Sequence, residues 1–150
     1  MSIKTITTNR RARFDYEVFD TFEAGMVLRG SEVKSLREAR ANLKDAYAIV
    51  KDGELFLIGC HISPYPFARD GGHEPDRTRK LLLHRHEIDR VRSQIEEKGR
   101  TLIPLKMYFK DGMIKLLIGL AMGKRKADKR QDIAKRDAQR DMDRAMSRKR

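Results

Sequence analysis

The stretch 101-TLIPLKMYFKDGMIKLLIGLA-121 consists of two apolar runs joined by an Asp-Gly pair at 111–112. Asp-Gly between alternating apolar residues is a strong signal for a β-hairpin with a two-residue turn. Successive side chains of a strand point to opposite faces, so Lys106, Tyr108 and Lys115 are predicted to point outward. The inward face is predicted to comprise Ile103, Leu105, Met107 and Phe109 on the first strand and Ile114, Leu116, Ile118 and Leu120 on the second.

The same turn signal occurs a second time, nearer the N-terminus. Residues 46–61, AYAIVKDGELFLIGCH, contain two strand-like runs split by an Asp-Gly pair at 52–53, which predicts another hairpin. Residues 14–28, FDYEVFDTFEAGMVL, have aromatic and β-branched residues in rough alternation. We expect strands there that bend near residues 20–21 and again near Gly25.

Two short helices are expected between the strands. The first, residues 31–39, has apolar residues three apart on one side and basic residues on the other. The second follows a long loop, residues 62–80, which holds three of the four prolines and two adjacent glycines, and it ends at Gly99. Its predicted apolar face consists of Ile88, Val91 and Ile95.

These patterns together predict a mainly β fold with some α. Five or six short antiparallel strands with two small helices indicate a closed or nearly closed barrel. Pro104 has no backbone N–H to donate, so a sheet edge or a bulge is expected there. The body is expected to span roughly residues 10–121, within a domain of residues 1–122, and a tail follows at residues 123–150.

The charge of the chain points to a polyanionic partner. The 150 residues include 34 Lys and Arg against 22 Asp and Glu, a net charge of +12. The tail holds 12 basic and 5 acidic residues, +7, which leaves +5 for the body. Because the body is basic as well, the excess is not confined to one end, and it is typical of a protein that binds nucleic acid.

Several other classes of protein are not expected. No run of about 18 apolar residues occurs, so no membrane-spanning helix is predicted. The first 14 residues lack the apolar region of a secretory signal. Cys60 is the single cysteine, which rules out an internal disulfide and fits the reducing cytoplasm.

The tail has helical propensity but little to bury. Charged pairs of opposite sign recur three or four residues apart, and each stabilises a helix by only about 0.2–0.5 kcal/mol. Its apolar stripe is mostly alanine, so burial offsets little of the roughly 1–2 kcal/mol of backbone entropy lost per ordered residue. We expect a segment that is disordered alone and folds on a partner. The alternative is a solvated basic tail that adds affinity for any RNA, whereas a membrane-surface helix would need larger apolar residues.

No pattern of residues indicates an enzyme. His84, His86 and Glu87 suggest a metal ligand set, but histidines two apart do not share a helix face, and no metal is expected. Cys60 and His61 would alternate to opposite faces of a strand, which favours a buried thiol. No arrangement of nucleophile, base and orienting group is recognisable. A nuclease that uses one of the two histidines remains the enzymatic alternative.

Basic residues gather in four places, which favours RNA binding over catalysis. If the barrel closes, several of them could form one phosphate-binding face, although for each one taken alone a solvated surface charge is the favoured interpretation. The four groups are Arg10, Arg11 and Arg13; Lys34, Arg37, Arg40 and Lys44; Arg77, Arg79 and Lys80; and Lys106, Lys115 and Lys124.

Long segments of the chain, in order, resemble the SmpB family, the tmRNA-binding proteins of bacteria. The segments are NRRARFDYE (9–17), FEAGMVLRGSEVKSLREARANLKDAYA (22–48), LIGCHISPY (57–65), HEPDRTRKLLLHRHEI (73–88) and KGRTLIPLKMYFKDGMIKLLIGLAMGKRKADKRQDI (98–133). Strings of this length are specific, and they cover nearly the whole chain. The resemblance implies an OB-type barrel of about six strands with about three short helices, and a basic tail that is unfolded in the free protein.

The resemblance also assigns residues to tmRNA binding. These positions are Glu23, Lys34, Asn42, Leu82 and Lys115. Three further residues, added on charge because they lie in motifs of the same face, are Arg11, Arg79 and Lys80. Glu23 either accepts hydrogen bonds from a base or a 2′-hydroxyl or holds the RNA-binding face in shape. Leu82 is better suited to packing than to contact with phosphate.

In the tail, the resemblance assigns ribosome binding to five positions. They are Gly123, Lys124, Asp128, Lys129 and Arg130. Two neighbouring positions depart from the family pattern. Met122 replaces a common lysine, and Ala127 stands where an aromatic residue or histidine could stack on a base of the decoding centre. Alanine cannot stack, so either the stack is dispensable or a neighbour such as Arg125 or Lys126 compensates.

The resemblance implies a non-enzymatic role, without metal or cofactor, in trans-translation. A SmpB protein binds the tRNA-like domain of tmRNA (SsrA RNA), and its body stands in for the missing anticodon arm. The expected partners are tmRNA, the decoding centre and mRNA channel of the stalled 70S ribosome, and elongation factor Tu with GTP and alanyl-tmRNA. The tail would become helical in the empty channel, and the nascent peptide would be tagged for degradation. A generic basic OB-type RNA-binding or ribosomal protein is the alternative.

Overall fold

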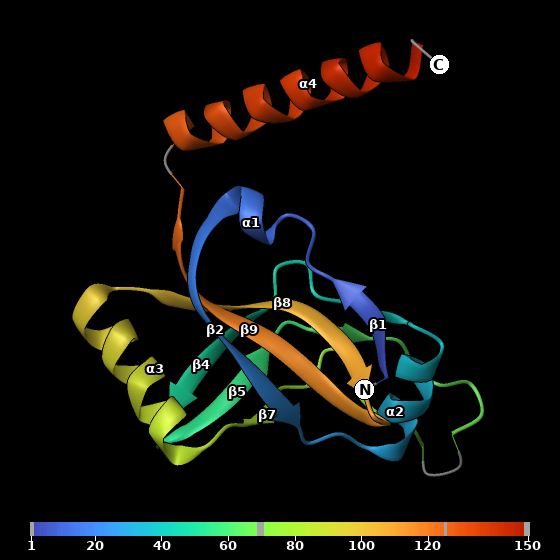
Figure 1. Cartoon of the computed structure of the whole chain (residues 1–150). Coiled ribbons are helices and arrows are strands. Elements are labelled where there is room, and N and C mark those ends of the chain that lie inside the picture. The colour runs from blue at the N-terminus through green and yellow to red at the C-terminus, as the bar shows by residue number, and fades with distance from the viewer. Residues whose placement is uncertain (1, 69–70, 125, 149–150) are drawn as a thin grey trace.

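The computed structural model describes residues 2–68, 71–124 and 126–148, without the side chains of residues 126–129 and 146–148. Its strands and helices alternate along the chain (Figure 1). In order they are β1 (Ile3–Thr8), α1 (Ala12–Asp15), β2 (Tyr16–Met26), α2 (Gly30–Arg37), β3 (Ala41–Asn42), β4 (Tyr47–Lys51), β5 (Glu54–Ile58), β6 (His61–Ile62), β7 (Arg79–Leu82), α3 (Arg85–Lys98), β8 (Thr101–Lys110), β9 (Met113–Gly123) and α4 (Lys126–Arg148).

Six strands form a closed antiparallel ring in the order β8, β4, β5, β7, β2 and β9, and β9 pairs with β8 to complete it. Strand β1 joins β8 from outside the ring, and β3 pairs with β6 as a separate two-stranded sheet. Figure 1 shows α3 and α2 at opposite ends of the barrel. The predicted small antiparallel barrel of about six strands is therefore confirmed.

The barrel is filled by aliphatic side chains that point inward from every strand of the ring. Packing them together removes a large apolar area from water, which is the main stabilising contribution to such a fold. The largest apolar side chains in this core, all almost fully buried, are Leu36, Leu43, Leu55, Leu57, Ile62, Leu81, Leu102, Met107, Leu116, Ile118 and Leu120.

Both predicted Asp-Gly hairpins are present. Asp52 and Gly53 connect β4 to β5 with φ angles of 53° and 75°, and Asp111 and Gly112 connect β8 to β9 with φ angles of 50° and 82°. Positive φ at both central residues is the geometry of a type I′ turn, whose twist matches that of the flanking strands. The turn residues therefore set the register of both hairpins.

Strand β8 contains a bulge that reverses its alternation. The pairing with β9 shifts by one residue between Pro104 and Lys106, so Leu105 is an extra residue on β8. Before the bulge Leu102 faces the main core and after it Met107 does, whereas Ile103 and Leu105 belong to a second, smaller apolar cluster. The prediction that Ile103 and Leu105 share a face with Met107 is therefore wrong, and the predicted irregularity at Pro104 is confirmed.

The N-terminal residues contain two elements that the sequence did not predict. Strand β1 lies outside the closed ring and buries only Ile6, so its sequence, IKTITT, has no continuous apolar face. The body thus begins near residue 3 rather than near residue 10. Residues 12–15 form the short helix α1 instead of the first part of a strand, and a register shift between Val18 and Thr21 marks the predicted bend in β2.

The two predicted helices of the body are present. Helix α2 buries Leu36 against the core. Helix α3 buries Val91, with Ile95 partly buried beside it. It ends at Gly99, whose φ of 62° is the left-handed conformation that glycine adopts most easily. The long loop between β6 and β7 is also present.

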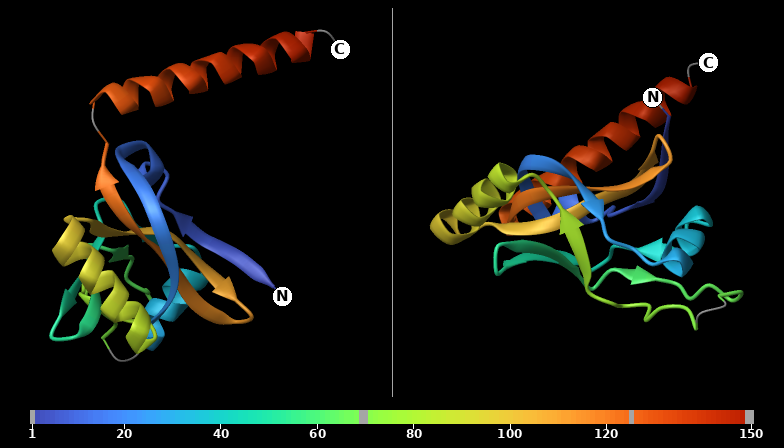
Figure 2. Two further views of the ribbon diagram at one scale, coloured as in Figure 1. Left: turned by 60° about the vertical axis from the view of Figure 1, so that its left-hand side comes forward. Right: turned by 90° about the horizontal axis from the view of Figure 1, so that it is seen from below.

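The tail forms helix α4, which stands apart from the barrel in Figure 1 and in the left view of Figure 2. The predicted helical propensity is confirmed. From residue 130 to 145 every side chain is exposed except the partly covered Asp132. So little burial would stabilise the helix only weakly in the free protein. The unfolding of the free tail stays a prediction. Strand β9 includes Gly123, paired with Tyr16, so the tail leaves the barrel one residue later than expected.

Candidate nucleic-acid interface

Three of the predicted RNA-binding residues come from three different strands and meet in one groove. Gly25 of β2 pairs with Lys115 of β9 on one side and with Leu82 of β7 on the other. Glu23 precedes Gly25 by two residues and so lies on the same face of β2. We call this space, about 580 Å³ in volume, the β2–β9 groove. Its walls also include Met26, Leu28, Val33, Leu83, His84, Glu87, Gly112, Met113 and Ile114.

Gly25 forms the floor of the β2–β9 groove. A Cβ atom at this position would lie 3.4 Å from the Cβ of Leu82 and 3.6 Å from one of its methyl groups. The missing side chain therefore leaves the backbone of β2 open between Lys115 and Leu82. Such an opening allows a ligand to approach the main chain closely. Leu82 is half exposed beside it and offers an apolar surface.

Glu23 is held by two donors from β8. The Tyr108 hydroxyl donates a 2.5 Å hydrogen bond to Oε2, and the Lys110 ammonium lies 3.2 Å from Oε1. The Tyr108 bond is the main reason that the pKa of Glu23 lies below its ordinary value, and Lys110 and Lys115 act in the same direction. Burial and the Glu23 bond raise the pKa of Tyr108 to about 12. The phenol thus stays a donor at neutral pH, and the carboxylate stays ionised.

This arrangement bears on two predictions. Tyr108 lies on the outer face of β8 as expected, but it is only 6% exposed, because Glu23 and its neighbours cover it. The Glu23 side chain remains 35% exposed. Its carboxylate therefore fixes the shape of the face and still has lone pairs for a nucleotide, so both roles considered for Glu23 remain compatible with the geometry.

Lys115 supplies positive charge to the same groove. It faces Tyr108 across the β8–β9 ladder. Among the residues that the structure describes, no carboxylate forms an ion pair with its ammonium. Lys115 is therefore available to a phosphate, whereas Lys110 is engaged by Glu23.

The other predicted RNA-binding residues lie outside the groove. Lys34 is exposed on α2, with its ammonium 5.5 Å from the centroid of the Tyr65 ring. Asn42 accepts a 2.8 Å hydrogen bond from the backbone N–H of Lys44. Lys80 forms a 3.0 Å ion pair with Glu54, and Arg11 a 3.4 Å pair with Asp15. All four side chains remain accessible, and their role in RNA binding stays a prediction.

Arg79 is a correction to the predicted site. Its side chain is fully buried, and its Nε donates a 2.5 Å hydrogen bond to Glu32, which is also fully buried. Its remaining donors reach backbone oxygens of Cys60 at 2.6 Å and Pro75 at 3.0 Å. A guanidinium that is enclosed and paired in this way cannot contact a phosphate, so the prediction of Arg79 as an RNA contact is wrong. It holds the long loop to the barrel instead.

Glu32 is the centre of that buried network and was missed by the sequence reasoning. Burial alone would raise its pKa, but hydrogen bonds from Arg77, from the backbone N–H of Arg29 and from Arg79 lower it overall. The Nη2 atom of Arg77 lies 2.5 Å from Oε1 of Glu32. The only signal available in the sequence is the pair of basic residues at 77 and 79, and their acidic partner is more than 40 residues away.

The junction of the body with the tail is built from α1 and the first turns of α4. The backbone N–H of Lys124 donates to the carbonyl of Asp15 at 2.9 Å, and its ammonium pairs with Asp132. The Arg136 guanidinium lies 4.8 Å from the centroid of the Phe14 ring. These contacts fix the direction in which α4 leaves the barrel.

The predicted tail residues lie around this junction. Gly123 ends β9, Lys124 bridges to Asp132, and Arg130 is exposed on α4. The side chains of Asp128 and Lys129 lie outside the described residues. Gly123 and Lys124 thus lie at the junction, and positions 128–130 lie on helix α4. Their contacts with the ribosome stay a prediction.

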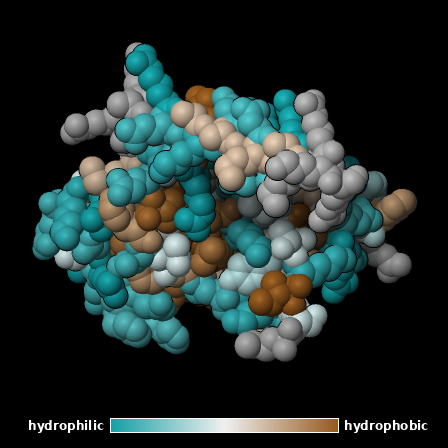
Figure 3. Space-filling view, turned by 45° about the horizontal axis from the view of Figure 1, so that its top comes forward, coloured by the Kyte–Doolittle hydropathy of each residue, from teal (hydrophilic) through white to brown (hydrophobic). Residues whose placement is uncertain are grey.

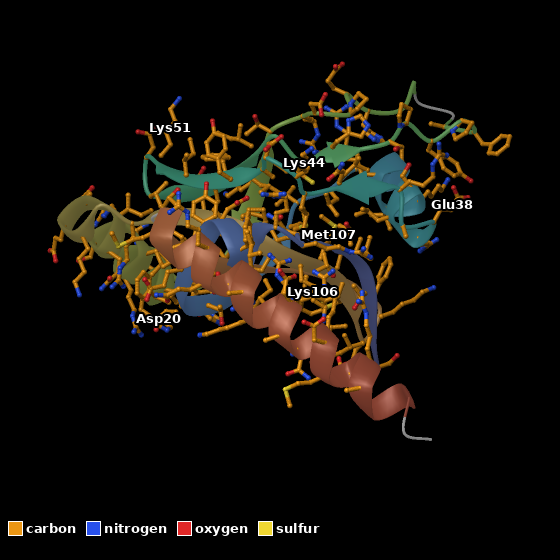
Figure 4. The ribbon with its side chains drawn as sticks, turned by 90° about the horizontal axis from the view of Figure 1, so that it is seen from above. Asp20, Glu38, Lys44, Lys51, Lys106 and Met107 are labelled. Atoms are coloured by element: carbon orange, nitrogen blue, oxygen red, sulfur yellow. The ribbon has the colours of Figure 1, made fainter. Side chains whose placement is uncertain are left out.

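The accessible surface fits a charged partner. Figure 3 shows that hydrophilic residues predominate on the face that carries α4, and that its hydrophobic atoms form separate patches. Figure 4 places Lys51 in the β4–β5 hairpin and Glu38 beyond α2 at opposite ends of the barrel.

Within the described ranges, no three His, Cys, Asp or Glu side chains gather as a metal site. In the same part of the chain, no helix is long and apolar enough to cross a membrane.

Comparison with known proteins agrees with this geometry. A family model described as SmpB protein matches residues 6–148. The chain belongs to the SmpB family. The family resemblance inferred from the sequence is thereby confirmed.

Two SmpB-family relatives match almost end to end. The chain is 53% identical to the SsrA-binding protein of Pelotomaculum thermopropionicum, with 97% of this chain and 95% of that relative covered. It is 56% identical to the SsrA-binding protein of Gloeothece citriformis, with 97% and 94% covered. A solved structure described as "tmRNA-SmpB: a journey to the center of the bacterial ribosome" contains a chain of 46% identity. It superposes with a TM-score of 0.67 over 85% of this chain and 93% of that chain.

Proposed function

We propose that this protein binds tmRNA and acts with it in trans-translation, the rescue of ribosomes stalled on messages without a stop codon. The observation that carries the proposal is the meeting of Glu23, Leu82 and Lys115 in one groove of a SmpB-family chain. The relatives are named for binding SsrA RNA, which is tmRNA. Family membership supports an RNA-binding protein rather than an enzyme.

The three residues of the β2–β9 groove have complementary roles in this proposal. Lys115 neutralises a phosphate of the tRNA-like domain, which gives affinity that falls with salt. Glu23 accepts a hydrogen bond from a 2′-hydroxyl or a base edge. The 2′-hydroxyl is the group that distinguishes RNA from DNA. Leu82 packs on the apolar face of a base or sugar, and the open backbone at Gly25 lets the nucleotide approach. The body then occupies the place of the anticodon arm that tmRNA lacks.

The tail serves the ribosome rather than tmRNA. Residues 123–150 enter the empty mRNA channel of the stalled 70S ribosome beyond the decoding centre, and α4 is the form they take there. The exposed arginines along α4 suit a path lined by ribosomal RNA, since phosphate contacts position a protein without reading sequence. A channel filled with message would exclude this helix. The tail thereby senses that the message is missing.

Two further assignments belong to the same proposal. Elongation factor Tu with GTP delivers alanyl-tmRNA together with this protein. The cytoplasm is the place of action, because stalled ribosomes are there and a single buried cysteine suits a reducing compartment.

A generic basic RNA-binding or ribosomal protein is the competing function, and the net charge of +12 favours it independently of the groove. A competition titration separates the two. The full-length protein is mixed with the labelled tRNA-like domain of tmRNA and competed with ordinary tRNA at two salt concentrations. Tight binding that survives the higher salt and resists tRNA supports tmRNA recognition. Equal competition by tRNA, with steep salt dependence, contradicts it.

A further inference from the structure

An exposed aromatic pair stands on the loop between β6 and β7. Phe67 is 76% exposed, more than any other large hydrophobic side chain that the structure describes. Its ring meets the ring of Tyr65 edge to face, with 5.7 Å between centroids and 72° between planes. The Lys34 ammonium lies 5.5 Å from the centroid of Tyr65. We call Lys34, Tyr65 and Phe67 the aromatic platform.

The chain holds this platform in place. The backbone N–H of Ala68 donates to the carbonyl of Tyr65 at 3.2 Å, which closes a turn with Pro66 and Phe67 at its centre. Proline is favoured at the second position of such turns because its φ is already fixed. The exposure of Phe67 is therefore a property of a defined turn.

The start of the same loop is fixed to α2 and the residues that follow it. Ser35 donates a 2.7 Å hydrogen bond from its hydroxyl to the carbonyl of Ser63. The backbone N–H of Ser63 donates to the carbonyl of Arg40 at 3.0 Å. The platform thus moves with α2, which also carries Lys34. Phe67 and Tyr65 therefore form an exposed aromatic surface whose loop is tied to α2.

The surroundings of the platform select RNA as the occupant. Lys34, Arg37 and Arg40 are exposed around the same end of α2. Aromatic rings beside cationic side chains are how proteins hold unpaired nucleotides, because every base has a face to stack and a phosphate to neutralise. Val33, the residue before Lys34, lines the β2–β9 groove. The groove and the platform therefore share helix α2, which contributes Val33 to the one and Lys34 to the other.

We propose that the aromatic platform stacks one unpaired base of the tmRNA bound in the β2–β9 groove, and that Lys34 contacts the adjoining phosphate. This inference rests on the proposed function. In this proposal the β2–β9 groove binds the folded surface of the RNA. The aromatic platform adds a contact with one unpaired nucleotide. Phe67 supplies the stacking face, and Tyr65 supports it edge-on.

A single substitution gives a direct reporter. The chain contains no tryptophan, so Phe67→Trp places the only indole of the protein on the platform. Titration with the tRNA-like domain of tmRNA is expected to quench the emission of this indole and to shield it from acrylamide. The midpoint of the quenching should coincide with the midpoint of RNA binding. Met142→Trp, on the exposed surface of α4, is the control and is expected to keep its emission. Unchanged emission of the Phe67→Trp protein at saturating RNA overturns the proposal.

Affinity provides the second readout. Phe67→Ala and Phe67→Leu are expected to weaken binding of the tRNA-like domain about 5- to 150-fold, the fold-change of one lost base–aromatic stack. Phe67→Tyr retains an aromatic face and is expected to bind like the unmodified protein. If Phe67→Leu binds as tightly as Phe67→Tyr, a hydrophobic contact without stacking is sufficient and the proposal is wrong.

The same titrations separate this inference from the proposed function. If the unmodified protein does not prefer the tRNA-like domain over ordinary tRNA, the proposed function fails. If that preference holds while both readouts at Phe67 are silent, only the platform fails. Quenching by 70S ribosomes and not by the tRNA-like domain overturns the proposal by assigning the platform to ribosomal RNA.

Discussion

The Tyr108 hydroxyl donates to the Glu23 carboxylate at 2.5 Å, and this bond joins β8 to β2 across the intervening strand β9. Because β9 carries Lys115, the bond sets the spacing of the acidic and basic groups of the β2–β9 groove. A buried phenol and a partly exposed carboxylate thus build the polar side of the candidate RNA site.

Replacement of Tyr108 by phenylalanine removes the hydroxyl and keeps the ring. We expect the free energy of unfolding to fall by about 1 kcal/mol, the usual net value of one hydrogen bond, since Glu23 is partly solvated. Affinity for the tRNA-like domain should fall a few-fold, because the carboxylate loses its fixed position. Urea denaturation and an RNA titration measure both, with the exposed Tyr47→Phe as control. An unchanged affinity would mean that the position of Glu23 does not matter for RNA.

The same pair predicts a dependence on pH. The pKa of Glu23 is lowered below its ordinary 4.5, chiefly by the Tyr108 bond, so the folded state favours the ionised carboxylate. The resulting stabilisation is fully present above pH 4.5 and is lost as the pH falls through the folded-state pKa. The difference in unfolding free energy between the unmodified protein and Tyr108→Phe should therefore shrink in acid. A difference that grows below pH 4.5 would contradict this reasoning.

Arg79 and Lys80 are neighbours on β7, but their replacement should reduce the free energy of unfolding by very different amounts. Arg79→Met removes the fully buried partner of the buried Glu32, and we expect a loss of about 3–5 kcal/mol of unfolding free energy. The fraction that remains folded should bind RNA normally. Lys80→Met breaks only an exposed pair with Glu54 and should cost less than about 1 kcal/mol. Urea denaturation of both variants tests this, and a stable Arg79→Met protein with weak RNA binding would reverse the correction made for Arg79.

Lys115→Ala tests the charge of the groove. Loss of one phosphate contact should weaken binding of the tRNA-like domain roughly tenfold and reduce the slope of log affinity against log salt by about one. Lys51→Ala removes an equal charge from the β4–β5 hairpin and is the matched control (Figure 4). The Lys51→Ala variant should lose little affinity. Equal losses for the two variants would indicate general attraction to the net charge.

Cys60 should be inert in the folded protein. Its thiol is fully buried, and burial raises its pKa to about 11, so the reactive thiolate is scarce at neutral pH. We expect no reaction with a thiol reagent in buffer and one equivalent in urea. Rapid labelling of the native protein would show that the loop held by Arg79 opens readily.

Local signals in the sequence were enough to predict the barrel. The Asp-Gly pairs at 52–53 and 111–112 tolerate the positive φ angles that a two-residue hairpin turn requires, and the flanking alternation indicates which strands they join. Helix α3 was predictable because Val91 and its apolar neighbours recur with helical spacing, and because Gly99 ends the helix. Strand β1 was not predictable, because a strand outside the ring buries one residue and shows no continuous apolar face.

Long-range contacts account for what the sequence did not predict. The bulge at Leu105 follows from pairing with β9, and alternation counted along β8 alone gives the wrong face for Ile103. The burial of Arg79 depends on Glu32, which is 47 residues away, so a charge count cannot separate it from the exposed Lys80. The groove residues came from the family resemblance, because no periodicity connects Glu23 with Lys115.

The central claim is that the barrel recognises tmRNA and the tail acts on the ribosome. The most direct measurement compares the full chain with a protein that ends at residue 124, where the last backbone bond to α1 is kept. Each is titrated with the tRNA-like domain and then assayed for peptide tagging on stalled ribosomes. We predict nearly equal affinity for the RNA and no tagging by the shortened protein. Loss of tmRNA affinity on removal of the tail would contradict the account.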